Sequence, residues 1–269
     1  MDMISLQGIQ KSYGSHRVLE DVDLTVRQGE IYGLIGKNGA GKTTIFKIIL
    51  GLTEFESGQL SIAGKSTKAG LESGRKKIGF FIGKNFFDYL TARENLEYYR
   101  RMKGIRDRSE TERVLKLVGL DKASGKFGSF SMGMKQRLGI ANAMLGDPEI
   151  LILDEPVNGL DPQGIADIRN LLTDMNREHG TTIIVSSHIL GELEHTATRF
   201  GIIDRGRVLR EITREDLKVP GDTIRLRVSD CAEAKRVLAE NGISVLPGSS
   251  EYKSLEDYYF ELVGGSIHD

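Results

Sequence analysis

Four residues in the first fifth of the chain have the types and the spacing that phosphate binding requires. Gly36 is followed by four residues and then by Gly41, Lys42 and Thr43. Polyphosphate needs several main-chain N–H groups pointing at it, and glycine lets the backbone curl closely enough to supply them. Lys42 would bring a positive charge to the β- and γ-phosphates of a nucleotide, and the Thr43 hydroxyl would reach Mg²⁺. The pattern predicts a P-loop.

The segments on either side of this loop are of the kind that must position it. The apolar run 31–35 predicts a short strand that enters the loop, and the apolar segment 45–50 predicts a helix that leaves it. The positive end of that helix would point at the bound anion. We therefore expect ATP to contact Gly36, Lys37, Asn38, Gly39, Ala40, Gly41, Lys42, Thr43 and Thr44.

A second candidate for chemistry lies at residues 150–155, where an apolar strand ends in two carboxylates, Asp154 and Glu155. In a nucleotide site Asp154 would hold Mg²⁺ through water, and Glu155 would polarise the attacking water. The alternative is a buried strand whose acidic end only meets solvent. A preceding P-loop favours the nucleotide role, with Thr43 and Asp154 as the metal residues and Glu155 as the general base.

The rest of the chain predicts an α/β domain with a mostly parallel sheet. Strands are expected within 4–26 and at 31–35, 60–62, 78–82, 150–153, 181–186, 200–204 and 208–211. From 149 they alternate with helices expected at 163–178 and 190–198. Between 92 and 146 only helical patterns occur, at 93–103, 109–118 and 133–145, which predicts a helical insertion.

The composition shifts again after residue 219. Strands are expected at 223–228 and 243–246 and helices at 232–240 and 255–262, so we expect an ATPase domain over 1–219 and a small α+β accessory domain over 220–269. The sole cysteine, Cys231, cannot form an internal disulfide, and we expect it to be an inert side chain.

The overall composition narrows the class of protein. Hydrophobic residues make up 39% of the 269 residues and charged residues 28%, which is ordinary for a globular protein. The net charge of -1 gives no basic field for nucleic acid, which we do not expect as a partner. No signal peptide is expected, and the apolar runs are far shorter than the ~20 residues of a membrane span. Any role at a membrane would go through a partner.

The order of motifs over about residues 1–215 resembles the ATP-binding subunit of ABC transporters. The resemblance implies an N-terminal antiparallel β subdomain beside the P-loop ATPase core. It implies that Tyr13 stacks on adenine, and that Ser131 and Gly133, in the sequence Ser-Met-Gly-Met-Lys-Gln-Arg, contact the γ-phosphate of ATP bound to the opposite subunit. It further implies that Asp161 belongs to a loop communicating across the dimer and that His188 contacts the γ-phosphate.

Four of these residues also have an ordinary structural explanation when each is taken alone. Tyr13 could pack, Ser131 could cap the helix starting near Gly133, Asp161 before a proline could form a turn, and His188 could end a strand. The joint order of the motifs favours the functional roles. For Ser131 the two explanations agree, because a capped helix would point its N-terminus at phosphate.

The chain departs from the family pattern in two places. Met132 and Met134 replace the glycine and glutamine that normally follow the signature serine. Gly83 falls where the family usually has glutamine or glutamate, a residue that touches Mg²⁺ and the attacking water in a loop that meets the transmembrane partner. Asn85 could replace it only in a loop shorter by one residue. The departures bear on hydrolysis and coupling rather than on nucleotide binding.

The segments 90–96, 130–141 and 254–262 resemble bacterial exporters of the bacitracin-resistance and lantibiotic-immunity type. The resemblance implies an ATPase that uses ATP and Mg²⁺ to power a separate integral membrane permease at the cytoplasmic face of the cell membrane, paired with an identical or related ATPase subunit. Two alternatives are a soluble ABC-type ATPase acting on nucleic acid or ribosomes, and a simple P-loop kinase. A soluble ABC-type ATPase of that kind usually carries two cassettes in one chain or a long coiled coil. A simple P-loop kinase would leave the Ser131 and His188 motifs unexplained.

Overall fold

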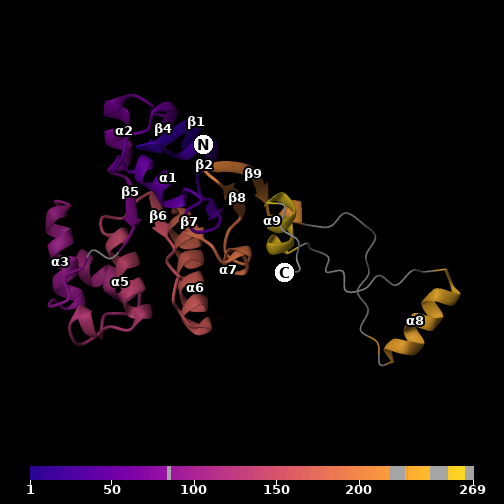
Figure 1. Ribbon diagram of the computed structural model, residues 1–269. Helices are drawn as coiled ribbons and strands as arrows, with labels where there is room; N and C mark the ends of the chain where they lie inside the picture. Colours follow the sequence, from indigo (N-terminus) through magenta and orange to yellow (C-terminus); the bar gives the residue numbers. More distant parts are fainter. Residues whose placement is uncertain (84–85, 218–227, 229, 243–253, 264–269) are drawn as a thin grey trace.

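The computed structural model describes residues 1–83, 86–217, 228, 230–242 and 254–263 (Figure 1). The strands are β1 (Asp2–Tyr13), β2 (His16–Arg27), β3 (Ile31–Ile35), β4 (Ser57–Ile62), β5 (Ile78–Phe81), β6 (Ile150–Asp154), β7 (Thr182–Ser187), β8 (Arg199–Asp204) and β9 (Arg207–Thr213). The α-helices are α1 (Lys42–Ile49), α2 (Lys68–Arg75), α3 (Ala92–Met102), α4 (Ser109–Leu117), α5 (Met132–Met144), α6 (Pro162–His179), α7 (Leu190–Glu194), α8 (Cys231–Glu240) and α9 (Leu255–Val263). Two short 3-10 helices, η1 (Phe127–Ser129) and η2 (Glu215–Leu217), complete the described elements.

The larger sheet has the strand order β5-β6-β7-β3-β8-β9. The first five strands are parallel and β9 is antiparallel to β8, so the expected mostly parallel sheet is confirmed. Its central strands are buried on both faces. In β6, for example, Ile150 and Ile152 face one apolar cluster and Leu151 and Leu153 face the other. This explains why these strands are apolar runs rather than alternating sequences.

The smaller sheet is antiparallel, with the order β2-β1-β4, as the resemblance implied. The expectation of short β segments in 4–26 was wrong in length, because β1 and β2 are 12 residues each and form one hairpin that closes at the pair Tyr13 and His16. Bulges along the hairpin interrupt the alternation of the side chains, which obscured one long strand in the sequence.

Helix α1 lies between the two sheets and positions the loop before it. Its residues Ile45, Phe46, Ile48 and Ile49 are buried in one cluster with apolar residues of β1, β2, β4 and the larger sheet. On the other face of the larger sheet a second cluster joins α3, α4, α5, α6 and α7. The helical insertion α3, α4 and α5 extends to one side of the molecule (Figure 1). None of the helices in these described ranges is long and apolar enough to cross a membrane.

Several elements differ from their predictions. Helix α2 was not predicted, since its sequence Lys-Ala-Gly-Leu-Glu-Ser-Gly-Arg has two glycines and little apolar periodicity. Helix α7 ends at Glu194 rather than at 198. The strand predicted at 243–246 lies outside the described part of the chain. The strand predicted at 223–228 also lies outside it, except for residue 228. The proposed boundary at 219 also lies there and stays a prediction.

The C-terminal helix α9 is not separate from the ATPase part of the chain. Its residues Leu255 and Tyr259 are buried in the same cluster as Leu193 of α7 and Ile202 of β8. The main-chain N–H of Leu255 also donates to the Glu194 carboxylate at 3.4 Å. The segment expected as an accessory domain therefore contributes at least this helix to the main core.

Two glycines allow the helical insertion to dock against the edge of the larger sheet. A Cβ on Gly79 of β5 would lie 1.8 Å from the carbonyl oxygen of Ala143 in α5. A Cβ on Gly139 of α5 would lie 2.4 Å from the ring of Phe81. Strand and helix are thus closer than any side chain at these two positions would permit.

The Gly79→Ala variant should lose stability because its methyl group must displace the α5 backbone. We expect the free energy of unfolding in urea to fall by about 1–3 kcal/mol, the usual range for overpacking a core. Gly191→Ala in α7 is the matched control, because a Cβ there meets no atom within 4 Å. A Gly79→Ala protein as stable as this control would contradict the close docking.

Candidate nucleotide-binding site

The loop from Gly36 to Thr44 is held in shape by close backbone approaches. A Cβ on Gly36 would lie 2.3 Å from the carbonyl oxygen of Ile203 in β8, so only glycine fits where the chain leaves β3. Gly41 has a φ of 113°, a left-handed conformation that favours glycine, at the start of α1. These contacts give a physical reason for both glycines of the sequence motif.

Lys42 carries its charge into the interior of this loop. Its side chain is 5% exposed, and its Nζ donates to the carbonyl oxygens of Gly36 at 2.6 Å and Lys37 at 3.2 Å. The Glu155 carboxylate lies 3.2 Å from the same Nζ. A buried ammonium group needs such acceptors. A phosphate entering the loop would compete with Glu155 for Lys42.

Thr43 and Asp154 meet as the sequence predicts for a metal site. The Thr43 hydroxyl donates to Asp154 Oδ2 at 2.6 Å, although the two residues are 111 positions apart. The other carboxylate oxygen accepts from the hydroxyl of Ser186 at 2.7 Å. A hydroxyl and a carboxylate are hard oxygen donors of the kind that Mg²⁺ prefers, and Mg²⁺ in phosphate sites takes its other ligands from phosphates and water. The residues present therefore fit this ion.

Glu155 is placed by an unusual backbone and by His188. Its φ is 52°, a left-handed conformation that is uncommon for a residue other than glycine and is typical of functional positions. Its main-chain N–H donates to Ser186 Oγ at 2.9 Å, and its carboxylate contacts Nδ1 of His188. Glu155 thus lies between Lys42 and His188.

Lys42, Thr43 and Glu155 line a cavity of about 420 Å³. Its lining residues come from the first hairpin, the P-loop and the segment after β6, and they are Tyr13, Val18, Asn38, Gly39, Gly41, Lys42, Thr43, Thr44, Glu155 and Asn158. Tyr13 is 48% exposed at the rim, with the Lys11 ammonium group 4.9 Å from its ring centre. The predicted stacking residue therefore does line the cavity and has an exposed ring.

The cavity lining lacks eight predicted residues. Five of them adjoin lining residues in the chain or contact them, and these are Gly36, Lys37, Ala40, Asp154 and His188. The other three are Ser131, Gly133 and Asp161. The Ser131 side chain accepts from the N–H of Met134 at 3.3 Å and caps α5, and Gly133 follows in the first turn. The Asp161 side chain accepts from the N–H of Gly164 at 2.9 Å and caps α6. The structural explanation of Ser131 as a helix cap is confirmed, whereas Asp161 is a helix cap rather than the turn residue that was the alternative. Within one chain neither lines the phosphate cavity.

Sequence reasoning missed two residues of the site. Ser186, which is completely buried, links Asp154 to the main chain of Glu155. Asn158 lines the phosphate cavity and also a second cavity of about 360 Å³, toward the helical insertion. The position of Ser186 at the end of β7, two residues before His188, was the available signal. For Asn158 no pattern in the sequence stood out.

Gly83 lines the second cavity together with Glu155 and Gln136. Its φ is 72°, and a Cβ there would meet no atom within 4 Å. A glutamine at this position would thus have space but a strained backbone, costing roughly 1–2 kcal/mol. The glycine is therefore matched to its loop conformation. Asn85, the possible replacement, lies outside the described residues.

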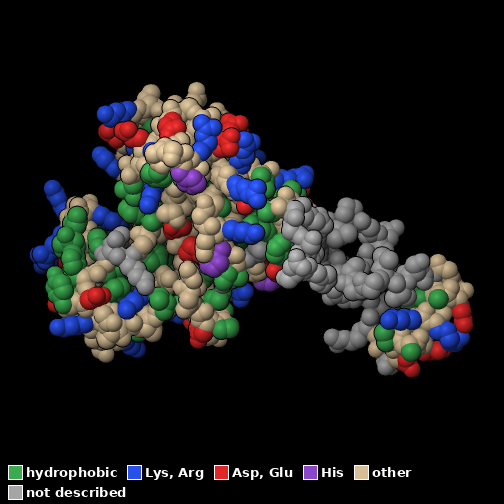
Figure 2. Space-filling model, in the orientation of Figure 1, with side chains coloured by type: hydrophobic (Ala, Val, Ile, Leu, Met, Phe, Trp, Pro, Cys, Tyr) green, Lys and Arg blue, Asp and Glu red, His purple; other side chains and the backbone are tan. Residues whose placement is uncertain are grey.

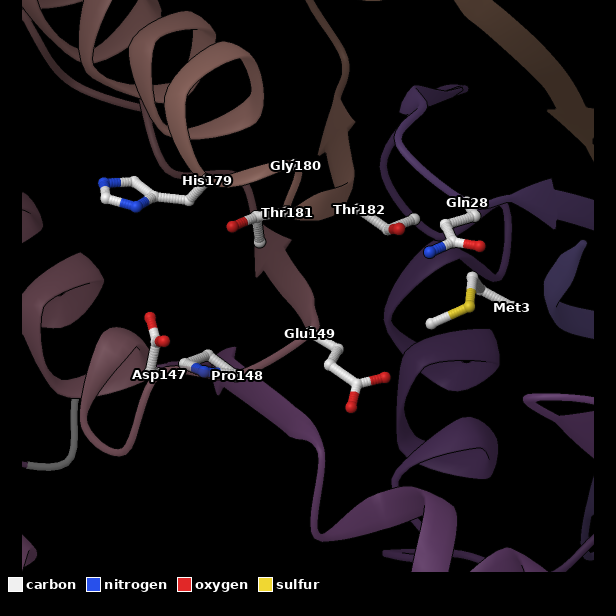
Figure 3. A pocket seen from close by; sticks show the side chains of 9 residues that line it. All are labelled: Met3, Gln28, Asp147, Pro148, Glu149, His179, Gly180, Thr181 and Thr182. Atoms are coloured by element: carbon white, nitrogen blue, oxygen red, sulfur yellow. The ribbon is translucent and has the colours of Figure 1, made fainter.

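A further cavity of about 210 Å³ lies at the amino-terminal ends of the strands, where β6 and β7 begin (Figure 3). It is lined by Asp147, Glu149, His179 and Thr182, among others, and Glu149 is already paired with Lys77 at 2.7 Å. Ligands of parallel α/β sheets bind at the carboxyl ends of the strands. The P-loop cavity is at that end, and this one is not.

Comparison with known proteins agrees with the geometry. The ABC transporter family profile matches residues 19–158. The chain is 38% identical to the bacitracin transport ATP-binding protein BcrA of Bacillus licheniformis, over 98% of both chains. It is 41% identical to the lantibiotic transport ATP-binding protein SrtF of Streptococcus pyogenes, over 78% of this chain and 90% of that one. A dimeric ATP-binding cassette solved in a post-hydrolysis state with ADP and Pi superposes with a TM-score of 0.71 and 29% identity, covering 79% of this chain and 99% of the other.

The Ser186→Ala variant should bind nucleotide but hydrolyse it slowly, because Asp154 and the Glu155 main chain lose a shared partner. We expect the ATPase rate to fall by about ten- to a hundredfold and the Mg²⁺ concentration for half-maximal activity to rise. Thr182→Val is the matched control on the same strand, since its hydroxyl accepts from the Gly29 N–H at 3.0 Å, at the opposite end of β7. Equal Mg²⁺ requirements in both variants would contradict the orienting role.

Proposed function

We propose, from the premise that this chain belongs to the ATP-binding family of ABC transporters, that it is the motor subunit of a bacterial exporter of antimicrobial peptides or other drugs. The observation that carries the motor function is the convergence of Lys42, Glu155 and His188 beside the pair of Thr43 and Asp154. These residues come from three separate segments, and all have the chemistry that cleavage of a phosphoanhydride bond needs.

The chain's own residues account for each part of ATP cleavage. The P-loop N–H groups and Lys42 bind the phosphates, and Tyr13 stacks on the adenine. Once the phosphates take over Lys42, the Glu155 carboxylate is released to accept a proton from the attacking water. His188 holds that carboxylate from the other side and can also reach the γ-phosphate. Thr43 and Asp154 would hold Mg²⁺, which neutralises charge on the phosphates.

The remaining predicted residues require a second ATPase subunit. Ser131 and Gly133 form the exposed start of α5, whose N–H groups and dipole favour an anion. They do not line the cavity of their own chain. A second copy, or a related chain, would bring its P-loop to this helix end, so that ATP is sandwiched between two subunits. Asp161, at the start of α6, would lie near the same interface.

This chain has a suitable docking surface for the membrane permease where β5 meets the helical insertion. A groove of about 130 Å³ is lined by Phe80, Phe81, Ile82, Gly83, Phe86, Tyr99, Lys103 and Asn142. Tyr89, Tyr98 and Met102 are exposed nearby, and Figure 2 shows hydrophobic side chains gathered over α3. Desolvation lowers the pKa of Lys103 to about 8, which leaves its ammonium group mostly charged near pH 7, so an acidic group on the permease would pair with it. The groove reaches Gly83, which also lines the cavity beside Glu155.

Export of antimicrobial peptides is supported by the relatives, whose names refer to bacitracin and lantibiotic transport. The position of the chain is then the cytoplasmic face of the cell membrane, held there by the permease. The alternative, a soluble ATPase acting on nucleic acid or ribosomes, is not favoured, because a net charge of -1 gives no overall basic field for a polyanion partner.

The Glu155→Gln variant should bind ATP and form a stable ATP-bound dimer, because the amide keeps the shape of the side chain but cannot accept the proton. We expect hydrolysis to fall at least about a hundredfold, and light scattering should give twice the monomer mass with ATP. Lys42→Ala is the control that should lose ATP binding and remain monomeric. Hydrolysis by Glu155→Gln at the normal rate would show that Glu155 is not the base.

The permease can be identified by isolating the complex from native membranes. Affinity purification of the Glu155→Gln variant with ATP should retain an integral membrane subunit. A Tyr98→Asp substitution at the exposed tyrosine of α3 should weaken its recovery. Cells lacking that subunit should become sensitive to bacitracin or to a lantibiotic. Recovery of ribosomes or nucleic acid in place of a membrane protein would instead support the alternative function.

A further inference from the structure

The segment after β6 forms a turn that carries Glu155, and this turn is anchored at both ends. The Asn158 N–H donates to the Glu155 carbonyl at 3.2 Å and closes the turn. At the start of the turn the Glu155 N–H donates to Ser186 Oγ at 2.9 Å. At its end the Asn158 carbonyl accepts from Nε2 of Gln136 in α5 at 3.4 Å. Because the left-handed φ of Glu155 is maintained only by its surroundings, both anchors bear on where its carboxylate points.

The first two turns of α5 lie along this same segment. A Cβ on Gly133 would be 3.8 Å from Cδ2 of Leu160, and a Cβ on Gly159 would be 3.7 Å from Cγ of Met132. Both are ordinary van der Waals distances. Gln136, one turn further along α5, extends this row of contacts toward the candidate base. The helix and the turn are therefore joined at three places and not by one hydrogen bond alone.

Gln136 is buried although its amide is poorly satisfied. The side chain is 8% exposed, and within the described part of the chain no group makes a hydrogen bond to its Oε1. A buried acceptor without a partner lowers the stability of the fold. A methionine would fill the same space without that cost. Stability therefore does not account for an amide at this position, which lines the cavity beside Glu155.

We propose that Gln136 is a positioning residue for ATP hydrolysis, which holds the turn through the Asn158 carbonyl and so orients the Glu155 carboxylate for proton transfer. The inference rests on the proposed ATPase function and deepens it. It also connects two ATP sites. The exposed start of α5 at Ser131 would contact ATP held by the other subunit, and Gln136 ties the same helix to the base of this chain's own site.

The test compares the full chain carrying Gln136→Met with the wild type, since methionine keeps the length of the side chain and removes its polar groups. We expect kcat for ATP hydrolysis to fall about tenfold because the carboxylate is less well aligned. The Kd for ATP of the monomer should stay the same, and the melting temperature should not fall. Asn176→Leu is the matched control, because this amide donates to the Gly29 and Thr181 carbonyls at 2.9 and 2.8 Å, where the strands begin. It should lower the melting temperature and leave kcat unchanged.

A double variant shows whether Gln136 acts through Glu155. Adding Gln136→Met to Glu155→Gln should cause no further loss of the residual single-turnover rate, since a base that is already absent cannot be misaligned. A further tenfold loss would overturn the inference, and so would a Gln136→Met protein with the kcat of the wild type. If Glu155→Gln hydrolyses ATP at the normal rate, the proposed base and the inference both fail. If Glu155→Gln is impaired and Gln136→Met is not, only the role of Gln136 fails.

Discussion

Lys42 carries a full positive charge into a place where little of its side chain meets water, and the surrounding residues have to compensate that charge. Two carbonyl oxygens of the loop and the Glu155 carboxylate do so. The carbonyls can converge only because the loop curls tightly at Gly36, which requires the close approach to Ile203. The Glu155 carboxylate can reach Lys42 only because β6 runs parallel to β7 and ends at the same side of the sheet as β3 and β7. Loop, sheet order and candidate base therefore depend on one another through a single ammonium group.

The sequence predicted those parts of the structure that depend only on residues close together in the chain. The P-loop, the strand that ends at Asp154 and Glu155, and the Ser131 cap of α5 each need only a few neighbouring positions. His188 was predicted through the order of motifs, and the structure places it on Glu155, 33 positions away in the chain. The family and the fold could thus be predicted, and so could the proximity of Thr43 to Asp154.

The parts that could not be predicted depend on contacts between distant segments. Ser186 is one serine among many until β7 is placed next to β6. Gly79 and Gly139 have no local signature, because the reason for each lies on the other element. The bulged hairpin β1–β2 hid its length, and α9 was expected in an accessory domain although it shares the main core. In each case the physical cause is a tertiary contact that a pattern within one segment does not contain.

The separation of Ser131 and Gly133 from the cavity of their own chain has a consequence for how activity scales with protein concentration. If each cleavage site is built from two chains, an isolated subunit contains two halves of different sites and no complete one. In dilute solution without the permease, the rate should then rise more steeply than in proportion to the amount of protein. The membrane subunit, by holding two copies side by side, would replace that dependence on chance encounter with a fixed local concentration.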